Sequence, residues 1–316
     1  MKLSRLYAVS LLPLFVACAG ASPEPETSGS HAAEEPSPPT LEPAAEAEPA
    51  AALTLQVVTS PDAGGAVNST LVLGETEVVV VDAQWTRSGA NAVADAVERS
   101  GRKLTYVFIT HAHPDHYFGA TVLEQRFPDA RVVATASTVE LMQKTAAAKA
   151  KAQAGMLKDE FPGEPIMPEV IQGELTVDGQ SLPLVEGMQG DTHSITGVKV
   201  PSANALIASD VVFSNAHAWT ADSSHESRQR WIAQLEEIEA LGFERIVPGH
   251  QAEGAPQTVA AVKQTAGYLE RFDSEVAKAT KSGPLIAAMQ ASYPELKALL
   301  FLQLGSQVQT GELKWQ

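Results

Sequence analysis

Apolar side chains in the first part of the chain follow two different periods, and each period predicts an element. Short apolar runs at 53–58 and 69–83 predict strands, and the second run folds back at a Gly-Glu-Thr turn. Residues 91–101 repeat their apolar side chains about every 3.6 positions and end in glycine, which predicts a helix and its C-terminal cap. The continuous run 104–110 (LTYVFIT) is typical of a strand buried on both faces.

The middle of the chain adds two helical patterns around one further strand. Residues 119–127 predict a helix, and residues 131–136 predict a strand. Residues 137–160 predict a long helix, with Ser137 as its N-cap and Glu140 three residues later. This helix and the Pro-rich segment after it stand between two groups of polar residues described below. A lid over the site that those residues build is one interpretation of this segment, and a plain surface helix and loop is the alternative.

The second half of the chain repeats the order of strands followed by helices. Residues 174–188 predict a hairpin, and residues 196–210 predict two further strands. A helix at 223–242, a short strand at 245–250 and a helical tail at 256–316 follow. Two successive sets of strands, each followed by helices, predict an α/β fold with two sheets face to face, a four-layer αββα sandwich. We expect residues 53–316 to form one domain that is helical from about residue 256.

The first 20 residues have the composition of an export signal. Lys2 and Arg5 precede an apolar stretch, 6–17, which is too short to span a membrane. The sequence FVAC, which ends at Cys18, resembles a bacterial lipobox. We expect a signal peptide of residues 1–17 and a lipid on Cys18, which would attach the protein to a bacterial membrane in the periplasm or at the cell surface. The alternative is an ordinary secretory signal in which the cysteine is incidental.

The amino-acid composition predicts the state of the segment after the signal and excludes some classes of binding partner. Residues 18–52 contain no Lys or Arg and are dominated by Pro, Glu, Ala and Ser. They offer too little apolar surface to offset the entropy of ordering, so we expect a disordered tether. The formal net charge of −16 repels phosphate backbones, so no nucleic-acid partner is expected. The single cysteine excludes an internal disulfide.

A dense polar cluster, HAHPDH, directly follows the continuous apolar run. Side chains two residues apart in an extended segment point the same way, so His111 and His113 can bind one ion together. Pro114 ends the extended segment, which redirects Asp115 and His116 toward a second ion. Neutral imidazole and carboxylate are zinc ligands, and a catalytic zinc site keeps a position for water. The sequence therefore predicts a metal site at the end of this strand.

Further candidate ligands stand at the ends of later apolar runs. His193 lies in the polar turn GDTHSITG, Asp210 follows ALIAS, and His250 follows RIVPG. Each alone is more typical of a capping or surface residue, but together they indicate strand ends that meet at one sheet edge. Over about residues 53–253 the chain resembles the metallo-β-lactamase superfamily. The resemblance is carried, in this order, by H-x-H-x-D-H, a His in a Gly/Thr/Ser turn, an Asp that closes a strand, and P-G-H.

The resemblance implies a site for two metal ions, with zinc expected and iron or manganese as alternatives. It implies that the first metal is held by His111, His113 and His193, the second by Asp115, His116 and His250, and that Asp210 bridges them. Asp82, which closes the run VVVVDA, matches the family's first-motif aspartate. The implied role of Asp82 is to orient a ligand histidine, and a plain strand-end aspartate is the alternative.

The same resemblance implies a metal-dependent hydrolase with a small-molecule substrate. Two cations would activate water for attack on an ester, thioester, lactone or lactam carbonyl, and Asp115 would both bind metal and receive a proton. The sequence has no Ser-His-Asp order, phosphate-binding loop or dinucleotide glycine fingerprint, so the metals would supply the chemistry.

Three alternatives to this general hydrolase stay open. Zinc β-lactamases of the common type carry Cys where Asp210 stands, and this chain has no obvious Lys after that position, which favours the thioesterases and lactonases over a β-lactamase proper. A non-catalytic metal-binding lipoprotein would show metal content without turnover. An iron-dependent redox enzyme would contain iron when purified. His217 and Trp219 are candidates for lining the substrate cleft, with plain packing as the alternative.

Overall fold

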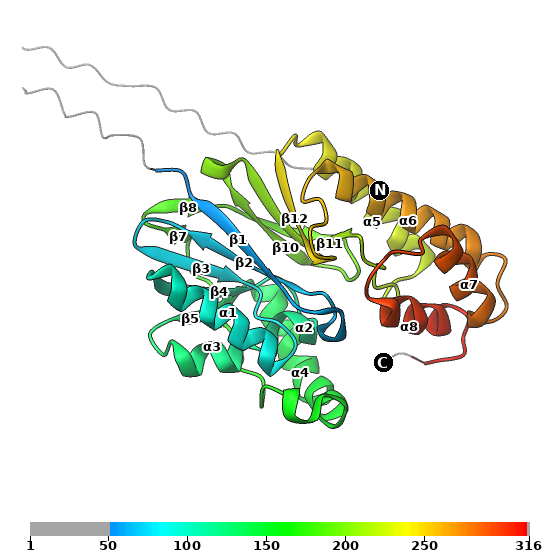
Figure 1. The fold of residues 1–316 in the computed structure, drawn as a ribbon, viewed down its shortest axis with the longest axis horizontal. Helices are drawn as coiled ribbons and strands as arrows, with labels where there is room; N and C mark the ends of the chain where they lie inside the picture. Colours follow the sequence, from blue (N-terminus) through cyan, green and yellow to red (C-terminus); the bar gives the residue numbers. More distant parts are fainter. Residues whose placement is uncertain (1–50, 315–316) are drawn as a thin grey trace, which may run out of the picture. The chain divides into compact units, whose positions relative to one another are not determined.

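The computed structural model describes residues 51–314, in which two β-sheets pack face to face and helices cover both outer faces (Figure 1). The predicted α/β fold, a four-layer αββα sandwich, is confirmed. The expected signal peptide, Cys18 and nearly all of the expected tether lie outside the described residues. Within residues 51–314, no helix combines the length and the apolar character that crossing a bilayer requires.

The first sheet has its six strands in chain order, β1-β2-β3-β4-β5-β6. The first three strands pair antiparallel, and the pairs from β3 to β6 are parallel. The predicted Gly-Glu-Thr turn joins the second and third strands. The bounds are β1 (Thr54–Thr59), β2 (Asn68–Leu73), β3 (Glu77–Val81), β4 (Lys103–Ile109), β5 (Arg131–Ala134) and β6 (Glu169–Val170).

The second sheet has four strands in the order β12-β11-β10-β9, and a separate two-stranded hairpin pairs β7 with β8. β11 pairs antiparallel with β10 and parallel with β12. The bounds are β7 (Leu175–Val177), β8 (Gln180–Leu182), β9 (Leu184–Met188), β10 (Ile195–Val200), β11 (Ala205–Ser214) and β12 (Arg245–Gln251).

Helices from the first half of the domain cover the first sheet, and helices from the second half cover the second sheet (Figure 1). The first set is α1 (Arg87–Ser100), α2 (Pro114–Tyr117), α3 (Ala120–Arg126) and α4 (Ala136–Leu157). The second set is α5 (His225–Ala240), α6 (Val259–Val276), α7 (Ser282–Ser292) and α8 (Leu299–Gln309). Short 3₁₀ turns are η1 (Asp62–Gly64), η2 (Lys158–Glu160) and η3 (Pro201–Ala203).

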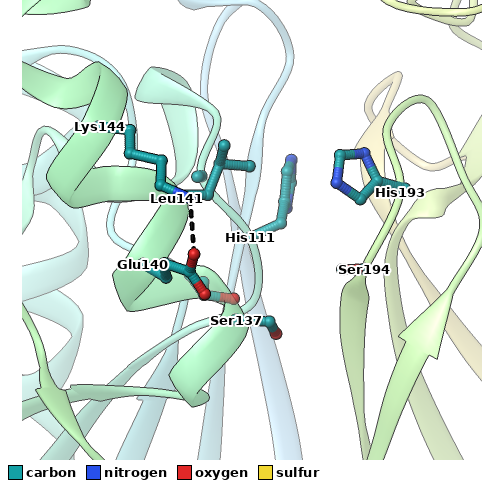
Figure 2. A pocket seen from close by; sticks show the side chains of 9 residues that line it. His111, Ser137, Glu140, Leu141, Lys144, His193 and Ser194 are labelled. Carbon is teal, nitrogen blue, oxygen red and sulfur yellow. Dashed lines mark hydrogen bonds and ion pairs between the residues drawn. The ribbon is translucent and has the colours of Figure 1, made fainter.

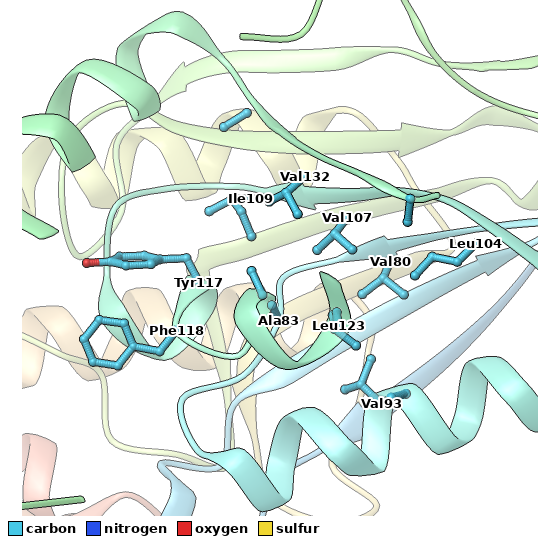
Figure 3. Packing of buried hydrophobic residues seen from close by; sticks show 14 of the residues in the cluster. Val80, Ala83, Val93, Leu104, Val107, Ile109, Tyr117, Phe118, Leu123 and Val132 are labelled. Atoms are coloured by element: carbon cyan, nitrogen blue, oxygen red, sulfur yellow. The ribbon is translucent and has the colours of Figure 1, made fainter. Parts of the chain in front are cut away.

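Alternate side chains of the central strands enter different hydrophobic layers. In β3, Val78 and Val80 pack under the helices of the first half, as Figure 3 shows for Val80 beside Val107. Val79 and Val81 point the other way, into the layer between the two sheets. The period of two in a strand places successive side chains on opposite faces, and each fully buried valine contributes about 1.5–3 kcal/mol. The continuous apolar runs of the sequence thus form strands covered on both faces.

Two boundaries differ from the prediction in ways that affect the site. The long helix α4 begins after Thr135, so Ser137 lies inside its first turn and is not the N-cap. Asp210 does not close its strand, because β11 continues to Ser214. The pairing of β11 with β12 shifts on both sides of Ser209, which has a positive φ of 49°. This irregularity in the strand takes the place of the strand end that the sequence predicted.

Candidate metal centre

The turn after β4 presents four candidate ligands on one short stretch of backbone. His113 keeps an extended conformation and precedes α2, whose first residue is Pro114. Proline suits this position because its fixed φ is helical and the missing N–H has no intrahelical partner there. The single turn of helix carries Asp115 and His116, which join a different group of ligand atoms from His111 and His113. The predicted change of direction within HAHPDH therefore has its physical basis in proline at a helix start.

One group of potential ligand atoms gathers around His111 and His113. Together with Asp191 and Asp210, these residues offer donor atoms that all lie within 4.8 Å of one another. Nε2 of His111 lies 3.6 Å from Oδ2 of Asp210, and Nδ1 of His113 lies 3.0 Å from Oδ2 of Asp191. Imidazoles and carboxylates at this spacing are suited to bind one divalent cation.

A second group lies beside the first and consists of Asp115, His116 and His250. Nε2 of His250 is 3.4 Å from Oδ2 of Asp115 and 3.4 Å from Nε2 of His116. Asp210 reaches this group as well, because its carboxylate oxygens lie 3.1 Å from His116 and 3.2 Å from His250. Asp210 is therefore placed between the two groups, where one carboxylate can contact two cations.

The ring nitrogens that face away from the second group are held by fixed acceptors. Nδ1 of His116 donates to Oδ2 of Asp82 at 2.8 Å, and Nδ1 of His250 donates to the carbonyl oxygen of Gly65 at 2.8 Å. Such partners set the tautomer that leaves Nε2 as a lone-pair donor, and they are the usual support of metal-binding histidines.

Asp82 and Thr110 link the two halves of the domain directly beneath the first group. The backbone N–H of Thr110 donates to Asp82 at 2.9 Å, and Ser209 from the second sheet donates to the same carboxylate at 3.2 Å. Oγ1 of Thr110 also lies 3.0 Å from Nδ1 of His111. The aspartate that the sequence pattern singled out thus contacts one histidine directly and a second through threonine.

Several buried atoms of these groups have no hydrogen-bond partner among the described residues. They are Nε2 of His111, Oδ1 of Asp210 and both carboxylate oxygens of Asp191. A buried carboxylate or imidazole nitrogen without a partner is costly in free energy, and such atoms are rare in folded proteins. The chemistry of the donors and their unsatisfied lone pairs fit a divalent cation.

Burial and mutual charge set the protonation of the same groups. Burial opposes ionisation of Asp210, but His116 and His250 outweigh it and hold the pKa of that carboxyl well below its ordinary value. Burial raises the pKa of Asp191 to about 7, against the opposing effect of His113. Burial opposes protonation of His113, yet Asp191 outweighs it and raises the pKa of the imidazole to about 9. A cation that binds these atoms takes the place of the protons that the carboxylates otherwise attract.

A sequence profile of the metallo-beta-lactamase superfamily matches residues 62–250, which is more than half of the chain and includes every residue of both groups. The chain belongs to the metallo-beta-lactamase superfamily. Members of this superfamily are mostly hydrolases that act on small molecules, and the donor set found here is in keeping with a divalent metal.

Solved structures with the same fold are distant in sequence. A metallo-beta-lactamase family protein of Thermus thermophilus is 18% identical with a TM-score of 0.57, covering 81% of this chain and 92% of its own. A beta-lactamase domain protein of Burkholderia ambifaria is 17% identical with a TM-score of 0.54, covering 84% of this chain and 89% of its own. A metallo-beta-lactamase of Pontibacter korlensis is 17% identical with a TM-score of 0.50, covering 69% and 94%. At these identities the likeness shows the fold.

One curated relative matches over a shorter stretch. The uncharacterized protein YobT of Bacillus subtilis (strain 168) is 36% identical over 77 residues, which is 24% of this chain. The match spans 33% of the relative's length, so it adds no statement about activity.

Six of the seven ligands expected for a metallo-beta-lactamase superfamily site lie in the two groups of this structure. They are His111, His113, Asp115, His116, Asp210 and His250. The seventh, His193, belongs to neither group and has an exposed side chain. Asp191, two residues earlier in the same turn, takes part in the first group instead. Asp191 was not predicted as a ligand, because His193, two residues later, stands in a turn where the family pattern expects a histidine.

The two candidates for the substrate cleft differ in their surroundings. His217 is 1% exposed, and its Nδ1 lies 3.2 Å from the hydroxyl of Tyr268 in α6, so it packs against the C-terminal helices. Burial lowers the pKa of His217 to about 4. Trp219 is half-buried and its indole N–H donates to Asp222 at 2.6 Å. Oδ2 of Asp222 is in turn 3.5 Å from Nε2 of His113, so Trp219 is connected to the metal centre through Asp222.

Lys149 is a further charged residue beside the site that the sequence pattern did not indicate. It extends from α4, and its Nζ donates to the carbonyl oxygen of Ala112 at 2.8 Å. Burial lowers the pKa of Lys149, and Asp222, Asp115 and Asp191 oppose that effect. The sequence around Lys149 is rich in Ala and Lys, so its helical pattern does not distinguish this lysine from the exposed lysines beside it. Its position shows only that the helix expected to form a lid reaches the turn that carries the ligands.

Proposed function

We propose that this protein is an exported, metal-dependent hydrolase that cleaves an ester, thioester, lactone or lactam, with zinc as the expected metal at two positions. The observation that carries the proposal is the convergence of buried imidazole nitrogens and carboxylate oxygens from both sheets, several of them without any hydrogen-bond partner among the described residues. Divalent cations bound there would lower the pKa of a water toward neutrality and polarise a substrate carbonyl.

The side chains of the site divide the remaining tasks. Asp210 separates the two groups and can neutralise charge at both, because it contacts His116 and His250 while facing His111. Asp115 is the carboxylate of the second group, and 19% of its side chain is exposed, against 1% for Asp210. It is therefore the group best placed to accept a proton from water and release it to solvent or to the leaving group.

The surroundings favour a substrate that carries a negative charge near the scissile bond. Lys149 places an ammonium group beside the ligand turn at Ala112. A cavity of about 170 Å³ opens next to this turn, between α4 and the turn after β9. Its wall includes His111, His193 and an ion pair in which Lys144 lies 2.6 Å from Glu140. Lys149 would give a substrate carboxylate bound beside Ala112 a charge-assisted contact that a neutral substrate lacks. Penicillins and cephalosporins carry a carboxylate next to the lactam ring, and acyl-glutathione carries its carboxylates farther from the thioester.

The test combines a metal analysis with a hydrolysis panel on the purified mature chain. The panel contains a cephalosporin, an acyl-glutathione and an acyl-homoserine lactone, of which the first two are anionic. We expect zinc in the protein, turnover of at least one anionic substrate and slower turnover of the neutral lactone. His113→Ala and Asp115→Ala should each lower kcat/KM by roughly 10³-fold or more, because each removes a ligand, with unchanged far-ultraviolet circular dichroism. Full activity after chelation, or in either variant, would refute the proposal.

Export and attachment to a membrane are proposed on the N-terminal sequence, Lys2 and Arg5 followed by residues 6–17 and Cys18. Labelled palmitate should enter the wild-type protein in a bacterial host and should not enter Cys18→Ser. Equal labelling of both proteins would exclude this lipid anchor.

A further inference from the structure

The turn between β9 and β10 holds Asp191 and His193 in different environments, although only Thr192 separates them. Asp191 is 1% exposed, whereas the side chain of His193 is exposed. Ser194, which follows, has a positive φ of 63° and redirects the chain into β10. The two candidate ligands of this turn therefore cannot reach the same point without a rearrangement of the backbone.

The backbone of this turn is fixed against β11 beside the bridging aspartate. The N–H of Asp191 donates to the carbonyl oxygen of Asp210 at 3.2 Å, and Gly190 closes the turn by donating to Thr192 at 3.0 Å. A Cβ on Gly190 would lie 2.5 Å from the carbonyl oxygen of Asp210, so only glycine allows this approach. Gln189 donates from its side-chain amide to the carbonyl oxygens of Gly190 and Thr192 at 3.0 and 3.1 Å. These contacts place the Asp191 carboxylate beside the first group of ligands.

The carboxylate of Asp191 is buried and lies against a ring nitrogen of His113. Its Oδ2 lies 3.0 Å from Nδ1 of His113, yet neither oxygen has a partner with hydrogen-bond geometry among the described residues. Two lone-pair donors that converge in this way are expected where a cation lies between them. His193 instead faces His111 across the cavity, as Figure 2 shows, and belongs to the wall of the cavity.

We infer that Asp191, in place of His193, is the third side chain that binds the first metal, and that His193 is a substrate-facing residue of the cavity. The inference rests on the proposed function in so far as it assumes a bound metal. With Asp191 as ligand, each side of Asp210 has two imidazoles and one carboxylate: His111, His113 and Asp191 on one side, Asp115, His116 and His250 on the other.

This arrangement has a consequence for the choice of metal. Three histidines and an open position are typical of zinc, whereas two histidines and one carboxylate bind zinc in some hydrolases and are also the ligand set of many iron(II) sites. Replacing an imidazole by a carboxylate also adds one negative charge to the first position. The site should therefore accept manganese or iron(II) more readily, relative to zinc, than a site with three histidines.

The experiment compares Asp191→Ala, Asp191→His and His193→Ala with the wild-type mature chain. Each protein is stripped with a chelator, loaded with Zn²⁺, freed of excess ion and analysed for metal by mass spectrometry, and its affinity is measured by competition with a coloured chelator. We expect two ions per wild-type chain and two in His193→Ala, with affinities within about 3-fold. Asp191→Ala should retain one ion, with the affinity for the other lowered roughly 100-fold or more.

Asp191→His keeps a ligand at the same backbone position and controls for damage to the fold. It should bind two zinc ions, and after loading with equal Zn²⁺ and Mn²⁺ it should hold a lower share of manganese than the wild type. Loss of an ion in His193→Ala, or two tightly bound ions in Asp191→Ala, would overturn the inference and leave the proposed hydrolase intact. Two ions in the wild type without hydrolysis of any substrate would overturn the proposed function and leave the inference intact. A wild-type chain that binds no metal would overturn both.

Discussion

The two halves of the domain contribute to the metal centre in different ways. The first half supplies His111, His113, Asp115 and His116 from one turn after β4. The second half supplies Asp191, Asp210 and His250 from a turn and from two neighbouring strands. In the first half, the positions of the four ligands along the chain nearly determine the distances between them in the structure. In the second half only the pairing of β11 with β12 and the turn clamped onto β11 bring the ligands together.

This difference explains where a ligand set is fragile. A turn of a few residues keeps its internal geometry as long as its flanking strand is buried, and β4 ends in side chains that are fully buried. A set built from separate strands depends on every contact between them, so small changes between the paired strands β11 and β12 should displace ligands. We expect changes in the second half to affect metal binding more than changes of similar size in the first half.

The largest effect is expected for Gly249→Ala in β12. A Cβ at this position would lie 1.8 Å from Oδ1 of Asp210 and 2.7 Å from its backbone nitrogen, so the carboxylate between the two groups must move. Metal affinity should fall roughly 100-fold or more at both positions, and the crowding should destabilise the fold by about 1–3 kcal/mol. Metal content and thermal unfolding measure the two effects.

Gly267→Ala in α6 is the matched control, because a Cβ there meets no atom within 4 Å. Alanine should stabilise this helix by up to about 1 kcal/mol and leave metal content unchanged. Two ions bound to Gly249→Ala with wild-type affinity would show that the contact between β11 and β12 tolerates displacement, and that the ligands of the second half are no more sensitive than those of the first.

An intermediate effect is expected for Asp82→Asn, which tests support within the first half. Asp82 accepts hydrogen bonds from His116 and Thr110, and it has a positive φ of 64°, a region that asparagine also tolerates. Loss of the carboxylate should lower metal affinity about 10–100-fold, since partners of this kind orient the ligand and raise its basicity. Competition with a coloured chelator measures the change.

Asp178→Asn provides the control for that substitution. Asp178 also has a positive φ, 46°, but it lies in the exposed turn of the β7–β8 hairpin. Its substitution should leave metal affinity unchanged. If Asp82→Asn lowered metal affinity as much as Gly249→Ala does, metal binding would depend as strongly on contacts in the first half as on contacts in the second.

The smallest effect is expected for Lys149→Met, which keeps the aliphatic stem and removes the charge beside Ala112. KM for anionic substrates should rise roughly 10-fold, equal to the loss of about 1.4 kcal/mol from a charge-assisted contact, with metal content unchanged. Lys151→Met, on the exposed side of the same helix, should change neither quantity. An equal rise of KM for the neutral lactone would contradict a role of Lys149 in binding the substrate's charge.

Much of the fold could be predicted because local patterns agreed with one another. The apolar run 104–110 and the helical spacing at 91–101 correspond to β4 and α1, and Gly101 caps the helix with a positive φ of 67°. The start of α4 was placed at Ser137 although Thr135 precedes the helix. A hydroxyl residue is available at both positions, and only the end of β5 decides which one begins the helix.

Some residues of the candidate site could be predicted from the sequence, and others could not. The HAHPDH turn was complete in the sequence, and its four ligand candidates lie together. Asp210 was identified by its place at the end of an apolar run, yet the run continues and an irregularity at Ser209 orients it. Asp191 and Lys149 were not identified, because the partners that give them meaning, His113 and Ala112, are distant along the chain.

The sequence by itself determined the period of each element, the α/β layers and the four ligand candidates of one turn, because these depend on neighbours within a few residues. The tertiary structure alone decided that Asp191 and not His193 faces His113, and that Lys149 reaches the same site. Strand pairing and the contact of one turn with β11 make those choices. These contacts form between groups that are far apart in the chain, so no local sequence pattern predicts them.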